Sequence, residues 1–98
     1  MNIQKTVNGA SLTFAVAGRL DTATAPKLEE EVRNSVEGIT ELVFDFEELE
    51  YISSAGLRVL LATQKTMNRQ GKMQLRNVNE TVMEVLEITG FAELLNIE

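Results

Sequence analysis

Residues 41–70 read ELVFDFEELEYISSAGLRVLLATQKTMNRQ, a strand pattern followed by a helix pattern. From Glu41 to Phe46, apolar side chains alternate at period two, which predicts a strand. Val43 on the other side of that strand indicates that both faces of its sheet are largely covered. From Ala55 to Gln70 apolar residues recur at helical spacing, which predicts a helix with one buried stripe. The stripe consists of Leu57, Leu60, Leu61 and Met67.

The residues before this stretch predict a hairpin and a helix. Two alternating strands flank Asn8-Gly9, a pair typical of a tight turn with two positive φ angles. The segment Gly18 to Asp21 interrupts the second strand. A helix follows from Thr24, a common N-cap residue, with Pro26 in its first turn and Gly38 at its end.

The residues after the stretch predict one more strand and one more helix. Gly71 is expected at the C′ position of the preceding helix. A short strand covers residues 72–77, and Asn79 caps a helix that Gly90 ends. The C-terminal residues predict a short helical turn and an extended end.

A single α/β domain over residues 1–98 accounts for this pattern. Strand, helix and strand alternate from residue 41 onward, which implies parallel crossovers, whereas the N-terminal hairpin is antiparallel. We therefore expect a mixed sheet of four to five strands with helices packed on it. The expected order is β-β-α-β-α-β-α plus a short C-terminal helix or strand.

The composition excludes several classes of function. The chain has no Cys and no His, so it lacks a thiolate nucleophile, the triad base and the usual zinc ligands. We expect no metal, no cofactor and no enzymatic activity. The net charge of −6 argues against a nucleic-acid partner, because binding to phosphates needs clustered Lys and Arg. Without a membrane-length apolar run or a signal-peptide core, we expect no membrane insertion and a cytoplasmic location.

Two hydroxyl side chains, Ser53 and Ser54, stand where the strand region leads into the helix. In open α/β sheets, ligands are met at the carboxyl ends of strands, and the free N–H groups of a helix N-terminus favour an anion. Gly56 is expected to leave the first turn open to a partner's close approach. A Ser at such a position is, by itself, most often an N-cap worth about 1 kcal/mol. The segment lacks the nucleophile elbow and the His that a hydrolase needs.

The segment from Asp45 to Leu57 resembles the signature of the STAS domain, specifically that of the bacterial anti-sigma factor antagonists, or anti-anti-sigma factors. Gly18 to Thr22 is similar to the Gly-x-Leu-Asp turn of that family. Gly71 to Met73 resembles the glycine before its fourth strand, and Val82 to Ile97 resembles its C-terminal helix and tail. The resemblance covers essentially the whole chain and implies a single STAS-type domain.

The resemblance implies that Ser54 is a phosphoacceptor. Ser53 falls where many members have Asp, which makes Ser53 a rival acceptor. Asp21 matches a loop Asp that lies near the phosphoacceptor in that fold, but an Asp there is equally common as a turn residue that bonds its own backbone. Gly56 is also expected near the phosphosite. The expected partner-binding residues are Ser53, Ser54, Ala55, Gly56, Leu57 and Arg58.

The function implied by the resemblance is that of a phosphorylation-controlled binding module. The unphosphorylated form binds an anti-sigma factor with serine-kinase activity and releases a sigma factor. Phosphorylation of Ser54 by that kinase switches binding off, and a serine phosphatase restores it. The alternative is a STAS scaffolding subunit of a transport or signalling assembly without the phosphate switch. A third hypothesis, a small enzyme or nucleotide binder, lacks the Gly-rich phosphate loop it needs.

Overall fold

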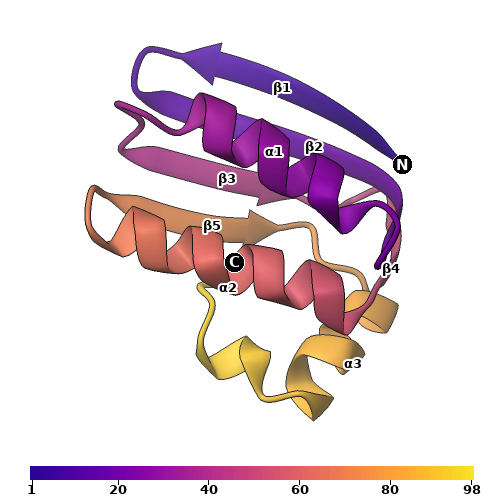
Figure 1. Cartoon of the computed structure of the whole chain (residues 1–98). Coiled ribbons are helices and arrows are strands. Elements are labelled where there is room, and N and C mark those ends of the chain that lie inside the picture. Colours follow the sequence, from indigo (N-terminus) through magenta and orange to yellow (C-terminus); the bar gives the residue numbers. More distant parts are fainter.

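A mixed five-stranded sheet carries two helices side by side on one of its faces (Figure 1). The computed structural model describes all 98 residues. The elements in chain order are β1 (Asn2–Asn8), β2 (Ser11–Leu20), α1 (Ala25–Ser35), β3 (Glu41–Asp45), β4 (Leu49–Ile52), α2 (Ser54–Asn68), β5 (Lys72–Arg76), α3 (Glu80–Ile88) and the 3-10 turn η1 (Phe91–Glu93). None of the helices combines the length and apolar character needed to cross a membrane.

The strands lie in the order β1-β2-β3-β5, with β4 paired to β2 outside this row. The β1–β2 pair is antiparallel, and the β2–β3 and β3–β5 pairs are parallel. The chain end adds one parallel bridge, because Ile97 pairs with Leu75 at the outer edge of β5. The predicted single α/β domain with a mixed sheet is therefore confirmed.

β4 is a strand that the sequence pattern does not predict. It runs parallel to the last three residues of β2, with Leu20 opposite Ile52. A bulge between Gly18 and Arg19 shifts the register, and Gly18 adopts a φ of 94° that a side chain would disfavour. The prediction that Gly18 to Asp21 interrupts the second strand is thus wrong, because β2 continues through the bulge and ends at Leu20.

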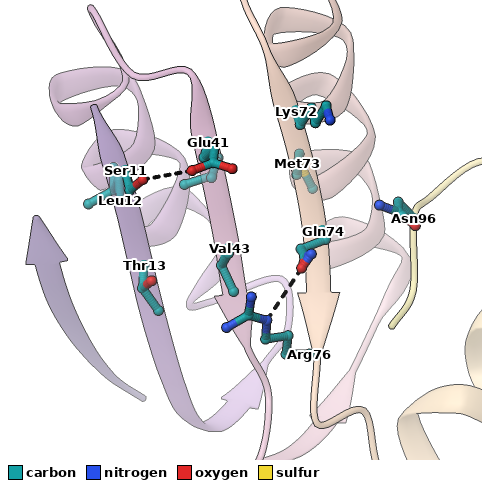
Figure 2. A pocket seen from close by; sticks show the side chains of 11 residues that line it. Ser11, Leu12, Thr13, Glu41, Val43, Lys72, Met73, Gln74, Arg76 and Asn96 are labelled. Carbon is teal, nitrogen blue, oxygen red and sulfur yellow. Dashed lines mark hydrogen bonds between the residues drawn. The ribbon is translucent and has the colours of Figure 1, made fainter. Parts of the chain in front are cut away.

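The hydrophobic core fills the space between the sheet and the pair α1 and α2. Alternate residues of β2, β3 and β5 point into it, and Phe44 lies between Phe14 and Phe46 with ring centroids 5.7 and 5.9 Å away. The other face of the sheet carries no helix and presents half-buried side chains such as Thr13, Val43 and Gln74 (Figure 2). The prediction that both faces are largely covered is therefore wrong.

The first hairpin turns one residue later than predicted. Asn8 is the last residue of β1 and pairs with Ser11, so Gly9 and Ala10 form the loop. Only Gly9 has a positive φ, 62°, which matches a type II′ turn rather than a turn with two positive angles.

The predicted cap of α3 is confirmed: the Asn79 side-chain oxygen accepts the Val82 N–H at 2.9 Å. The Asn79 amide also donates to the Leu49 carbonyl at 2.6 Å, which ties α3 to β4.

Gly71 has a different role from the predicted C′ position. Its φ is not positive, and α2 ends at Asn68, three residues earlier. A Cβ on Gly71 would overlap the backbone carbonyl of Thr40, which accepts the Lys72 N–H at 2.9 Å. The position requires glycine because the chain entering β5 passes directly against the chain entering β3.

Gly71→Ala is expected to lower the free energy of unfolding by about 1–3 kcal/mol, because the added methyl group meets backbone that must shift. Urea unfolding followed by circular dichroism measures this change. Lys72→Ala is the matched control, since it removes an exposed neighbouring side chain and is expected to change stability by less than about 0.5 kcal/mol. Equal stabilities of Gly71→Ala and wild type would contradict the assigned contact.

Candidate functional site

The two serines lie at the edge of the sheet where β2 and β4 both end. Leu20 of β2 and Ile52 of β4 are partners in register, and the Ser53 N–H donates to the Leu20 carbonyl at 2.9 Å. Asp21 follows Leu20 directly, just as Ser53 follows Ile52. The structure therefore brings the Asp21 loop and the serine segment together at one edge, which is the usual place for ligands in such sheets.

Asp21 organises the turn between β2 and α1. Its Oδ1 accepts the backbone N–H groups of Ala23 and Thr24 at 3.0 and 3.2 Å. In return, the Asp21 N–H donates to the Thr24 hydroxyl at 2.9 Å, and that hydroxyl lies 2.8 Å from the Arg19 carbonyl. Thr24 holds the N-cap position of α1, but its side chain is bonded back into the turn and not to the helix. Asp21 thus acts as a turn residue and lies at the serine edge as well.

The carboxyl group of Asp21 is held in its ionised form. Partial desolvation favours the neutral acid, but the hydrogen bonds from Thr24 and Ala23 outweigh that effect. The charge of Arg19, whose Nε lies 3.8 Å from Asp21 Oδ2, acts in the same direction. The pKa of Asp21 is therefore lowered from its ordinary value, and the ionised carboxylate lies beside the guanidinium of Arg19 at this edge of the sheet.

Ser53 and Ser54 occupy different environments. Ser53 is the N-cap residue of α2 in an extended conformation, yet its side chain makes no capping bond and its Oγ is buried without a hydrogen-bond partner. Ser54 is the first residue of α2 and is exposed. The helical bonds begin with the Leu57 N–H, which donates to the Ser53 carbonyl at 3.0 Å. The N–H groups ahead of Leu57 lie beside Ser54 and have no partner within the helix.

Gly56 and Leu57 face the sheet and not the solvent. Both are buried, and a Cβ on Gly56 would lie 2.7 Å from Leu20 Cγ and 2.9 Å from Ile52 Cγ1. The interpretation of Gly56 as an opening for a partner is therefore wrong, because its missing side chain lets α2 pack closely on the ends of β2 and β4. Among the six residues predicted to bind a partner, Ser54 and Arg58 are exposed, Ser53 and Ala55 are half-buried, and the other two are buried.

Arg19 and Tyr51 form a pair that was not predicted from the sequence. They face each other across β2 and β4, and the Arg19 guanidinium carbon lies 4.4 Å from the centre of the Tyr51 ring. This is the geometry of a cation–π contact, and it keeps Arg19 beside Asp21. The only signal for the pair is the pairing of β2 with β4, so it could not be found without predicting β4.

A hollow lies on the open face of the sheet, and neither Ser53 nor Ser54 lines it (Figure 2). Polar and apolar residues line it together, and two of its hydrogen bonds join lining side chains: the Ser11 hydroxyl donates to Glu41 at 2.9 Å, and Arg76 Nε donates to the Gln74 side chain at 3.3 Å. No group of three or more acidic side chains is placed to hold a metal ion anywhere in the chain. The serine edge presents an accessible hydroxyl, free N–H groups and fixed charges, an arrangement suited to binding and to modification.

Comparison with known proteins agrees with this geometry. The family model described as the STAS domain matches residues 2–98. BtrV of Bordetella bronchiseptica, whose name assigns it provisionally to the anti-sigma factor antagonists, is 38% identical over 88 residues, which cover 88% of this chain and 76% of BtrV. The anti-sigma-B factor antagonist of Bacillus subtilis is 28% identical over 98 residues, covering 99% and 90% of the two chains.

Solved structures show the same fold. The crystal structure of an anti-sigma factor antagonist from Mycobacterium paratuberculosis superposes with a TM-score of 0.88 at 22% identity. The superposition covers 98% of this chain and 83% of the other. The arrangement of sheet and helices is therefore shared although the two sequences are only 22% identical.

The lowered pKa of Asp21 predicts a pH dependence of stability. A group whose pKa falls on folding stabilises the fold above its unfolded-state pKa, and this stabilisation is lost as the pH falls through the folded-state pKa. Asp21→Asn keeps the Oδ1 acceptor and removes the charge. We expect it to flatten the loss of stability that wild type shows below about pH 5 in urea unfolding.

The matched control for this measurement is Glu48→Gln, which removes an exposed carboxylate that makes no side-chain hydrogen bond. It is expected to keep the wild-type loss of stability in acid. If Asp21→Asn and wild type lose stability in parallel as the pH falls, the charge of Asp21 does not support the turn.

Proposed function

Since the chain belongs to the STAS domain family, we propose that it is an anti-sigma factor antagonist, which binds an anti-sigma factor and thereby releases a sigma factor. The observation that carries the proposal is the exposed Ser54 at the start of α2, in a chain whose relatives bear the name of antagonists. A chain without His or Cys also suits a protein that binds and is modified, and we propose no catalytic activity for it.

Phosphorylation of Ser54 is the proposed switch. The partner, an anti-sigma factor with serine-kinase activity, transfers the γ-phosphoryl group of ATP to Ser54 Oγ, with release of ADP and the hydroxyl proton. The exposure of Ser54 supports this choice over Ser53, whose Oγ is buried. The free N–H groups at the start of α2 also favour an anion at Ser54. A serine phosphatase removes the phosphate, and because the cycle consumes ATP we propose that it runs in the cytoplasm.

The energy required for such a switch is small. A phosphate adds about −1.5 to −2 charges at pH 7, together with bulk and a large desolvation cost in an interface fitted to a hydroxyl. A difference of about 2.8 kcal/mol between the two forms weakens binding a hundredfold. The proposed contact surface is centred on Ser54, Ala55 and Arg58. Its position on the sheet is fixed by the packing of their less exposed neighbours Ser53, Gly56 and Leu57.

Phosphosite mapping tests the acceptor. The protein is incubated with the cognate anti-sigma factor and ATP, and the modified residue is located by mass spectrometry. Ser53→Ala is expected to be labelled as fully as wild type, because its Oγ is inaccessible, and Ser54→Ala is expected to remain unlabelled. Stoichiometric labelling of Ser54→Ala would make the assignment wrong. A wild-type chain that no candidate ATPase labels would favour the scaffolding alternative.

Binding measurements test the role of the charge. Ser54→Asp is expected to weaken binding to the anti-sigma factor at least about tenfold, because a carboxylate replaces a hydroxyl within the proposed interface. Asn68→Asp introduces the same charge at the exposed far end of α2 and is the matched control, expected to bind as wild type does. Calorimetry with the purified proteins gives both affinities. Equal affinity of Ser54→Asp and wild type would contradict a switch based on charge.

A further inference from the structure

α2 carries cations and no anion. Within Ser54–Asn68 the charged residues are Arg58 and Lys65, and the first turn contains no acidic side chain. Arg58 is exposed and forms no hydrogen bond or ion pair with any other residue of the chain. A cation this close to the positive end of a helix dipole is unfavourably placed. The unphosphorylated helix therefore lacks the negative charge that its N-terminal half would favour.

Ser54 is placed to supply that charge. It precedes Arg58 by four residues, so the two side chains lie on the same face of α2, one turn apart. Side chains of a helix lean toward its N-terminus, which directs the Arg58 side chain back over the turn of Ser54. The chain already contains this spacing as an ion pair: on α1, the Arg33 guanidinium lies 3.0 Å from Glu29.

We propose that Arg58 is the intramolecular counter-ion of a phosphate on Ser54, an inference that rests on Ser54 being the acceptor. An anion four residues before a cation is the favourable order on a helix, and the guanidinium fork matches two phosphate oxygens. Arg19, the other arginine of this edge, is already held between Asp21 and the Tyr51 ring. Arg58 is therefore the cation that is free to turn to the phosphate.

This pairing gives phosphorylation a second effect on the partner surface. In the unphosphorylated protein Arg58 is exposed beside Ser54 and is available to an acidic group of the partner. Once paired with the phosphate, the same guanidinium is neutralised and withdrawn from that surface. Phosphorylation thus adds a negative charge to the surface and removes a positive one.

The test uses the full chain with phosphoserine incorporated at position 54 during synthesis, so it does not depend on the kinase. The second ionisation of the phosphate is titrated by phosphorus NMR in wild type, Arg58→Gln and Lys65→Gln. We expect the phosphate of wild type to ionise roughly 0.2 to 0.4 pH units lower than that of Arg58→Gln, as an ion pair of this spacing predicts. Lys65→Gln, which removes a more distant cation of α2, is the control and is expected to follow wild type.

Titration at high salt and titration of a conservative variant test whether the shift comes from an ion pair. The difference between wild type and Arg58→Gln is expected to shrink in 1 M salt, where charges on the surface are screened. Arg58→Lys keeps the charge and loses the fork, and is expected to titrate between the other two. Identical titration curves for wild type and Arg58→Gln at low salt would overturn the proposal, even if mapping with the kinase confirms Ser54 as the acceptor. Failure of the kinase to label Ser54 would instead overturn the proposed function. It would not change the titration result, because that experiment does not use the kinase.

Discussion

The site depends on one constraint, the close contact of α2 with the paired ends of β2 and β4. The bulge at Gly18 lets β2 continue beyond its pairing with β3 and accept β4 as a new partner. Gly56 then permits α2 to lie directly on Leu20 and Ile52, with no room for even a methyl group. This packing fixes where the first turn of α2 begins and therefore which residue stands exposed at its N-terminus.

Much of the fold could be predicted because its signals are local. The alternation in β3, the apolar stripe of α2 and the side-chain cap at Asn79 each depend on neighbouring residues. The alternation and the cap are found in the structure, as are Leu57, Leu60 and Met67 of the stripe. Leu61 is only half-buried, and Val59 and Thr63 are buried in addition to the predicted residues. β4 could not be predicted in this way. It has four residues, two of them polar or half-exposed, and its partner is the part of β2 that follows a bulge. Its existence is decided by pairing between segments about thirty residues apart, which no local pattern reports.

The same distinction between local signals and long-range packing applies to the residues of the candidate site. The position of the serines before a helix and the turn chemistry of Asp21 follow from residue types, so both could be predicted. The difference between Ser53 and Ser54 could not, because burial of one hydroxyl and exposure of the next depend on how α2 meets the sheet. Gly56 shows the same limit. A glycine in a first turn is compatible with an open surface or with tight packing, and only the distance to Leu20 distinguishes the two.

The rigid support of the site bears on the kind of switch it can provide. The first turn of α2 is held by Gly56 on the sheet and by the bond from Ser53 N–H to Leu20, and neither contact involves the Ser54 side chain. The proposed phosphate on Ser54 would project into solvent and meet N–H groups and a cation that favour it, so it would supply no force that displaces the helix. A switch built in this way changes the charge of a fixed surface. The partner then has to discriminate between two electrostatic states of one shape, which needs only the few kcal/mol that a single buried charge costs in an interface.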